Sequence, residues 1–202
     1  SFVPKGMLNA YNERQKQIAY TNTHFLTASR YISKKASKIN SIDDLKGKSV
    51  VSTAGTTNIK QLTEANAARG LNINIIPAKD HAEAFLMVET DRAVAFVMDD
   101  ILLASLVAGS KAPADYVISN DAFSKPEPYG IMLRKDDPAF KKAVDDSIKA
   151  MAKSGEVAKL YDKWFLQAIP PTNTKVGLPL SEATKAAWAS PNDKPMEDYA
   201  KK

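Results

Sequence analysis

Between residues 48 and 100 there are three short apolar segments, and each is followed by a segment with the residue pattern of a helix. Each apolar segment has the length and β-branched content of a strand, and each stops where a helical pattern begins. The three segments are residues 49–52, 73–76 and 93–98. Such alternation predicts a parallel or mixed sheet with helices packed on it. Because open α/β sheets bind ligands at the carboxyl ends of their strands, we expect a binding site along that edge.

Polar residues occupy all three of these predicted strand ends. The first strand runs through the turn Thr53-Ala54-Gly55-Thr56-Thr57 into a helix, whose unpaired N–H groups and positive dipole end favour an anion. His81 begins the second helix, and Asp99 with Asp100 begins the third. Each residue also has a purely structural interpretation, since threonine caps helices, aspartate suits a helix N-terminus, and His81 suits a cap or the surface.

The segments around this stretch predict one complete lobe and part of another. Residues 25–32 and 131–134 have the composition of strands and look like two crossings between lobes. Residues 28–133 are therefore expected to form an α/β lobe with a mostly parallel sheet flanked by helices. Residues 1–27 would be a remnant of the other lobe with the first crossing, and residues 134–202 would return to it as helices and a tail.

Apolar stripes identify the faces on which the predicted helices pack. Ile59 and Leu62 mark the buried face of one helix, and Phe85 and Leu86 mark that of the next. Two further helices, residues 139–153 and 155–165, have stripes that require a partner surface. Their apolar side chains include Phe140, Ile148, Leu160 and Trp164.

Composition excludes several classes of function. The 202 residues have a net charge of +5, but the basic side chains are dispersed among acidic ones, which argues against a nucleic-acid partner. Cysteine is absent, and the two histidines show no metal-ligand spacing, so neither a metal nor a cofactor is expected. No apolar stretch reaches the roughly 18 residues of a membrane span. The sequence thus favours a binding protein over an enzyme.

A series of motifs resembles the periplasmic glutamate/aspartate-binding proteins of bacterial ABC importers, in solute-binding protein family 3. The motifs are Glu13-Arg14-Gln15-Lys16-Gln17, Asp44-Leu45-Lys46-Gly47-Lys48, Ser52-Thr53-Ala54-Gly55-Thr56-Thr57, Ala78-Lys79-Asp80-His81, residues 92–100, residues 129–137 and Asp162-Lys163-Trp164-Phe165. The resemblance covers about residues 13–193 and implies two α/β lobes that close on an acidic amino acid. It also implies a periplasmic location, with L-glutamate or L-aspartate and the membrane subunits of the importer as partners.

The resemblance assigns a role to each candidate binding residue. Arg14 would clamp the α-carboxylate of the ligand through two parallel hydrogen bonds, and Thr57 would add its hydroxyl and backbone N–H. Asp99 would pair with the α-ammonium group. His81 would reach the side-chain carboxylate, and Thr56 would assist.

This chain departs from the family pattern at its beginning. The sequence of the first lobe should precede Glu13, and Met7-Leu8-Asn9-Ala10-Tyr11 stand where the family has a hydroxyl-rich run. We therefore expect weakened binding. We also expect Phe2, Val3, Met7, Leu8 and Tyr11, or a second copy in a homodimer, to cover the exposed helices. The alternatives are an interaction fragment that self-associates or swaps domains without a ligand and, more remotely, a dehydratase-like enzyme using Asp99 with His81.

Overall fold

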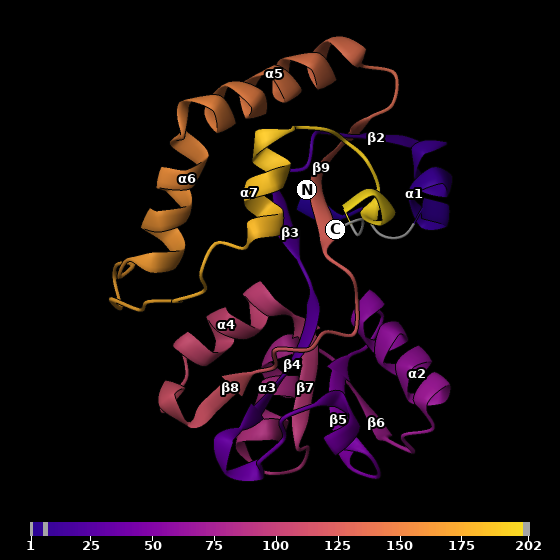
Figure 1. Ribbon diagram of the computed structural model, residues 1–202, viewed down its shortest axis with the longest axis vertical. Coiled ribbons are helices and arrows are strands. Elements are labelled where there is room, and N and C mark those ends of the chain that lie inside the picture. Colours follow the sequence, from indigo (N-terminus) through magenta and orange to yellow (C-terminus); the bar gives the residue numbers. More distant parts are fainter. Residues whose placement is uncertain (1, 6–7, 200–202) are drawn as a thin grey trace. The chain divides into compact units, whose positions relative to one another are not determined.

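The chain forms two compact units in the computed structural model, which describes residues 2–5 and 8–199, without the side chains of residues 2–4 and 8–10. The first unit combines Ser1–Thr27 with Lys125–Lys202, and the second unit is Ala28–Ser124 (Figure 1). The second unit is therefore an insertion between the two segments that build the first.

A five-stranded sheet forms the centre of the second unit, in the order β6-β5-β7-β4-β8. Its strands are β4 (Ser29–Lys34), β5 (Ser49–Thr53), β6 (Asn74–Ala78), β7 (Ala95–Asp99) and β8 (Tyr116–Ile118). β5 is parallel to β6 and β7, whereas β4 is antiparallel to both β7 and β8. The sheet is thus mostly parallel, as predicted, with β4 running against the other four strands.

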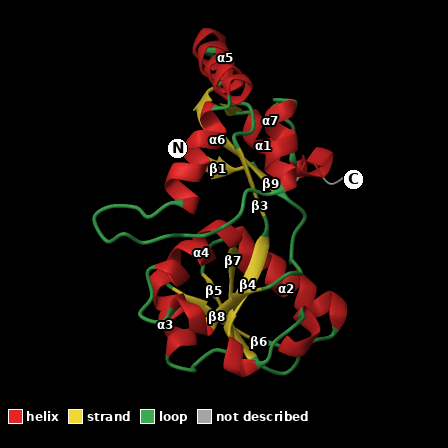
Figure 2. Ribbon diagram, turned by 60° about the vertical axis from the view of Figure 1, so that its left-hand side comes forward, coloured by secondary structure: helices red, strands yellow, loops and turns green. Residues whose placement is uncertain are grey.

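Helices cover both faces of this sheet (Figure 2). Because side chains alternate along a strand, the adjacent residues Val50 and Val51 belong to different core clusters. Val50 packs in the cluster that contains Leu62 of α2 (Thr57–Arg69). Val51 packs in the cluster that contains Phe85 of α3 (His81–Glu89) and Leu103 of α4 (Asp100–Ala108). The predicted α/β lobe with helices on both faces is confirmed.

The predicted apolar faces of α2 and α3 are partly wrong. Leu62 and Phe85 are buried as expected, but Ile59 is half-buried and Leu86 is 52% exposed. The buried face of α3 is instead formed by Ala84, Phe85, Met87 and Val88. Leu86 lies between these two buried pairs in the sequence, and the helical repeat therefore places it on the opposite side of α3.

One strand organises the sheet of the first unit. β1 (Phe2–Pro4), β2 (Ile18–Tyr20) and β3 (Phe25–Thr27) all pair antiparallel with β9 (Glu127–Arg134). The predicted second lobe extended to residue 133, but these main-chain pairs place β9 in the first unit. The second unit ends at Ser124 for that reason.

Aromatic side chains of two of the three C-terminal helices pack near β3. The three helices are α5 (Pro138–Ser154), α6 (Glu156–Tyr161), which continues as one wide turn over Asp162–Leu166, and α7 (Glu182–Ala189). Tyr161 is buried, and its ring centroid lies 6.1 Å from that of Phe25, 4.6 Å from Phe165 and 6.4 Å from Trp188. The indole N–H of Trp188 donates to the carbonyl of His24 over 2.9 Å. Aromatic packing thus connects α6 and α7 to β3, whereas α5 is held by Asp145, which accepts from the backbone N–H of Asn22 over 2.6 Å.

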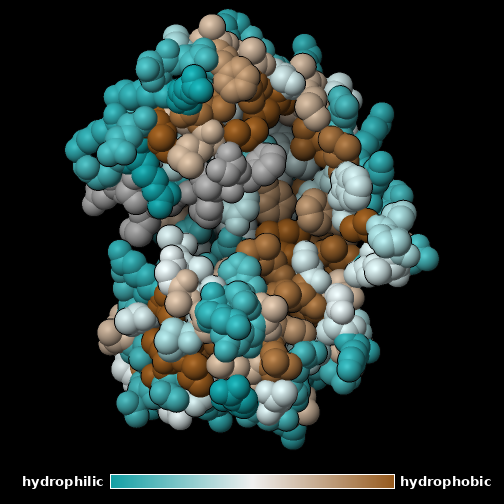
Figure 3. Space-filling model, turned by 180° about the vertical axis from the view of Figure 1, so that it is seen from behind, coloured by the Kyte–Doolittle hydropathy of each residue, from teal (hydrophilic) through white to brown (hydrophobic). Residues whose placement is uncertain are grey.

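The outer sides of α5 and α6 retain exposed apolar residues. Phe140 is 53% exposed, Leu160 38% and Trp164 46%. Apolar side chains accordingly reach the surface of the first unit among polar ones (Figure 3). The side chains of Phe2, Val3, Met7 and Leu8, which we expected to provide cover, lie outside the described residues.

A buried lysine joins the beginning of the chain to its end within the first unit. Lys5 is fully buried and donates from Nζ to Oγ1 of Thr23 over 3.1 Å, and the Tyr199 hydroxyl donates to the same oxygen over 2.8 Å. Burial lowers the pKa of Lys5 to about 7. A Cβ at Gly130 would lie 2.6 Å from Cε of Lys5, so this glycine makes room for the lysine.

Candidate binding site in the second unit

Three neighbouring strands of the second unit end along one edge of the sheet. β5 pairs in parallel with β6 and β7, with Thr53 opposite Ala78 and Ser52 opposite Val97. Asp99 ends β7, and the helices that start at Thr57 and His81 follow β5 and β6. The predicted placement of Thr57, His81 and Asp99 at adjacent strand ends is therefore confirmed.

Thr56 caps the helix that follows β5. The turn before it requires glycine, because Gly55 has a φ of 74°. Thr56 accepts from the backbone N–H of Ile59 over 3.3 Å and donates its hydroxyl to the carbonyl of Thr53 over 2.7 Å. Thr57 is the first residue of α2 and is exposed. The capping interpretation is thus confirmed for Thr56, and Thr57 is the threonine that faces solvent.

His81 is not the cap of its helix. That position is held by Asp80, which accepts from the backbone N–H of Glu83 over 2.8 Å. The half-buried imidazole instead lies against the end of β5, with Nδ1 2.7 Å from Oγ1 of Thr53. The ring is therefore held at the strand edge by a contact that capping does not explain.

Asp99 is a buried carboxylate that makes no capping hydrogen bond, although it occupies the N-cap position of α4. It is 4% exposed, and Oδ1 accepts from Nδ2 of Asn58 over 2.9 Å. Asn58 is itself 3% exposed and also donates to Oγ of Ser29 over 3.1 Å. Asp99 is therefore a buried, hydrogen-bonded carboxylate at the end of β7 and not the side-chain cap of α4.

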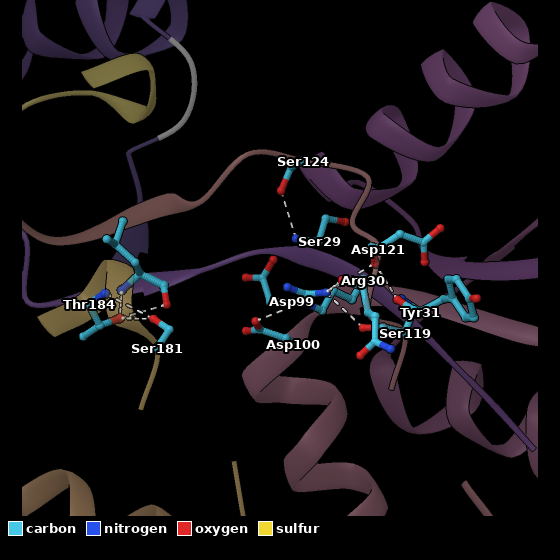
Figure 4. Close-up of polar contacts among 12 residues, drawn as sticks. Ser29, Arg30, Tyr31, Asp99, Asp100, Ser119, Asp121, Ser124, Ser181 and Thr184 are labelled. Atoms are coloured by element: carbon cyan, nitrogen blue, oxygen red, sulfur yellow. Dashed lines mark hydrogen bonds and ion pairs between the residues drawn. The ribbon is translucent and has the colours of Figure 1, made fainter. Parts of the chain in front are cut away.

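The neighbouring Asp100 has a structural role. Its carboxylate lies 3.6 Å from Nε of Arg30 in β4. The guanidinium group of Arg30 also donates to the carbonyls of Ser119 and Asp121, over 3.0 Å and 3.4 Å (Figure 4). The ion pair thus joins the start of α4 to β4, and Arg30 in turn joins β4 to the segment after β8. Asp99 remains the candidate for a ligand.

Sequence reasoning missed two residues that support this edge. Thr53 and Asn58 lie on either side of the Gly55 turn, and each bonds one candidate residue, Thr53 to His81 and Asn58 to Asp99. A signal for Asn58 was present, since it lies one turn before Leu62, on the buried face of α2. Thr53 had no comparable signal, because a threonine at a strand end is common.

Arg14 belongs to a different unit from the other four predicted binding residues. It lies in the last turn of α1 (Leu8–Gln15) of the first unit, and its side chain is exposed. Thr56, Thr57, His81 and Asp99 all belong to the second unit. Four of the five predicted residues therefore come from one compact unit.

The described part of the chain lacks two features that would indicate another class of protein. Across residues 2–5 and 8–199, no helix combines the length and apolar character needed to cross a bilayer. In the same part of the chain, no three His, Asp or Glu side chains are grouped so that they would hold a metal ion.

Sequence comparisons find relatives over most of this chain. The profile of the bacterial extracellular solute-binding proteins, family 3, matches residues 6–167. The L-glutamate/L-aspartate-binding protein of Pseudomonas aeruginosa is 50% identical over 185 residues, which are 92% of this chain and 61% of that protein. The glutamate/aspartate import solute-binding protein of Escherichia coli is 46% identical over 184 residues, 91% of this chain and 61% of that protein. This chain thus spans about three fifths of these relatives.

Solved structures show the same fold. An ancestral arginine-binding protein bound to arginine aligns with a TM-score of 0.63 and 29% identity, over 76% of this chain and 66% of that one. The GluR0 ligand-binding core of Nostoc punctiforme, in complex with L-glutamate, aligns with a TM-score of 0.60 and 27% identity, over 76% of this chain and 68% of that one. Both are similar to this chain in fold, and each is named for an amino-acid ligand.

Proposed function

Since this chain belongs to the bacterial extracellular solute-binding proteins of family 3, we propose that it binds L-glutamate or L-aspartate and presents it to the membrane subunits of an ABC importer. Two relatives with 50% and 46% identity are named for glutamate and aspartate, which supports this choice of ligand. A periplasmic location is part of the proposal, as is binding without catalysis.

The buried carboxylate of Asp99 is the observation on which the proposal depends. It is held by a neutral amide at the edge where strands β5, β6 and β7 end. An α-ammonium group would supply the opposite charge through charge-assisted hydrogen bonds, which are stronger than neutral ones. Asp99 is therefore assigned to the ammonium group of the ligand.

The other residues are assigned to the two acid groups of the ligand. Thr57 offers a hydroxyl and a backbone N–H at the start of α2, where the helix dipole favours a carboxylate. Arg14 belongs to the first unit, and we propose an α-carboxylate as its ligand because a planar guanidinium group suits two parallel hydrogen bonds. His81 is assigned to the side-chain carboxylate. Thr56 contributes by fixing the start of the helix.

Calorimetric titration of the 202-residue chain with L-glutamate, L-aspartate and L-glutamine tests the proposal. Asp99→Asn keeps the size of the side chain but removes its charge. It should weaken binding about 10- to 150-fold, the range expected for one charged hydrogen bond of about 1.5–3 kcal/mol. Asp115→Asn, which changes an exposed acid of the same unit, should leave the affinity unchanged.

Two results would contradict the proposal. One is the absence of binding heat with both acidic amino acids for a chain whose circular dichroism and unfolding show that it is folded. The other is equal affinity of the wild type and Asp99→Asn. Weaker affinity for L-glutamine than for L-glutamate is expected from the acid-binding role of His81.

A second candidate function rests on the exposed apolar residues of α5 and of the turn that continues α6. Phe140 and Trp164 are 53% and 46% exposed. They favour an interaction fragment that self-associates and binds no ligand. Light scattering alongside the titration separates the two functions, because self-association without binding heat supports the second alone.

A further inference from the structure

We propose that Thr53 is a positioning residue that keeps a hydrogen on Nε2 of His81 and thereby makes His81 a permanent donor toward an acid group. The specificity part of this inference rests on the proposed function. The positioning part concerns only the second unit without a ligand, and it is tested separately.

The contact between the two residues is short and well supported. Oγ1 of Thr53 lies 2.7 Å from Nδ1 of His81, and Thr53 is 6% exposed. Thr53 is fixed by strand pairing opposite Ala78, and the backbone N–H of Ala54 donates to the Ala78 carbonyl over 2.8 Å. His81 starts α3 only three positions after Ala78, so the main chain holds both ends of the contact. Threonine is also stiff at χ1 because it is β-branched.

The hydroxyl of Thr53 suits both charge states of the imidazole. In the neutral ring one nitrogen carries a hydrogen and the other accepts, whereas both nitrogens donate in the cation. Toward a neutral ring the hydroxyl donates to Nδ1. Toward a cation its oxygen accepts from Nδ1–H. In both cases Nε2 carries a hydrogen, because the partner of one ring nitrogen determines the state of the other.

The opposite neutral tautomer would leave the hydroxyl hydrogen of Thr53 without a partner. If Nδ1–H donated to Oγ1, that hydrogen would need a second acceptor. Among the hydrogen bonds of the described residues, Oγ1 of Thr53 has His81 alone as its partner. Leaving a buried donor unsatisfied costs free energy, so the geometry selects the tautomer with hydrogen on Nε2.

This selection favours an acid over an amide. A hydrogen on Nε2 can donate to a carboxylate oxygen or to the amide oxygen of glutamine, and the bond to an ionised group is the stronger of the two. The opposite tautomer would present a lone pair, which repels a carboxylate but accepts from the NH₂ group of glutamine. Removing the Thr53 hydroxyl should therefore admit the second tautomer and reduce the preference for L-glutamate over L-glutamine.

Nitrogen-15 spectra of the ligand-free, full 202-residue chain at alkaline pH test the positioning role. The chain has two histidines, and the spectrum of His81→Gln identifies the signals of His81. In the wild type the shifts of the neutral ring should show hydrogen on Nε2 alone. Thr53→Val, which keeps the side-chain shape, should shift both signals toward a mixture of tautomers. Thr53→Ser, which restores the hydroxyl, should return them.

Titration with L-glutamate and L-glutamine tests the specificity role. The ratio of the two dissociation constants should fall about 2-fold in Thr53→Val, because an equal mixture of tautomers leaves half of the molecules with the Nε2 donor. It should remain near the wild-type value in Thr53→Ser. Thr63→Val is the matched control, since Thr63 is an exposed threonine of α2 whose hydroxyl donates to the carbonyl of Ile59. It should leave both the spectra and the ratio unchanged.

The outcomes separate this inference from the proposed function. Hydrogen on Nδ1 in the wild type, or identical His81 spectra for the wild type and Thr53→Val, would overturn the positioning role. An unchanged ratio in Thr53→Val would overturn the specificity role. A wild type with the Nε2 signature that binds neither amino acid would support the positioning of His81 while removing the proposed function.

Discussion

Asn58 and Asp99 are joined by a hydrogen bond of 2.9 Å between two side chains that are only 3% and 4% exposed. The bond links the first turn of α2 to the end of β7. It explains how a carboxylate remains buried at the sheet edge, since hydrogen bonds to charged groups stabilise more than neutral ones.

Replacing Asn58 should therefore destabilise the second unit. Asn58→Ala removes a donor from a buried carboxylate, and we expect a loss of about 1.5–3 kcal/mol in the free energy of unfolding, measured with urea. Asn74→Ala is the matched control, because the Asn74 amide also donates to a serine, Ser49, but is exposed. Equal effects of the two substitutions would show that the buried bond has no special role.

The two threonines of the Gly55 turn should respond differently to alanine. Thr56→Ala removes the N-cap of α2 and should lower the free energy of unfolding by about 1 kcal/mol. Thr57→Ala alters an exposed first helical residue, so its stability should remain near that of the wild type while its affinity for L-glutamate decreases. Urea unfolding and calorimetry of both variants check this. A Thr57→Ala variant as unstable as Thr56→Ala would contradict the division of roles.

Lys5 should make stability depend on pH. Its folded-state pKa of about 7 lies below the ordinary value of 10.5, so between these values the unfolded state binds a proton that the folded state does not. The penalty for burying the charged form is fully present below pH 7 and disappears as the pH rises toward 10.5. The stability of the wild type relative to Lys5→Met should therefore increase across this window, by up to about 1.4 kcal/mol per pH unit.

Urea unfolding of both proteins at several pH values provides the measurement. Lys46→Met, which changes an exposed lysine in the same way, is the control. A difference between the wild type and Lys5→Met that stays constant from pH 7 to 10 would contradict the burial of a neutral Lys5.

Exposed apolar residues of the first unit should promote association between copies. Sedimentation velocity should show a concentration-dependent dimer that Trp164→Ala weakens, because Trp164 lies in the turn that continues α6 and is 46% exposed. Leu86→Ala is the control, since Leu86 is 52% exposed in the second unit. A monomer at all concentrations would rule out the predicted homodimer.

Periodicity and turn residues predicted most elements of the second unit. Three strands and the helices after them were expected within one or two residues of where they lie, and Gly70 ends α2 with a φ of 60°. These features are local. A glycine with positive φ ends helices in many folds, and a short apolar run forms a strand in many folds. The resemblance to a known family then brought together residues that local patterns leave separate.

The features that sequence reasoning missed depend on contacts between distant segments. The composition of β4 predicts a strand but not its direction. The antiparallel pairing of β4 with β7 could therefore not be predicted from the alternation of strands and helices along the chain. Thr53 and Asn58 acquire their roles only because β6 and β7 lie beside β5. Leu86 is apolar and was predicted to lie on the buried face of α3, but it is exposed. The residues on either side of it pack against the sheet instead.

The pairing of β1, β2 and β3 with β9 joins segments that the whole second unit separates in the sequence. The ribosome completes the whole second unit before it makes β9, and domains generally fold as units while synthesis continues. The second unit therefore folds first, with the candidate residues Thr57, His81 and Asp99 already assembled. β1, β2 and β3 can pair with β9 only after the whole of the second unit has been synthesised.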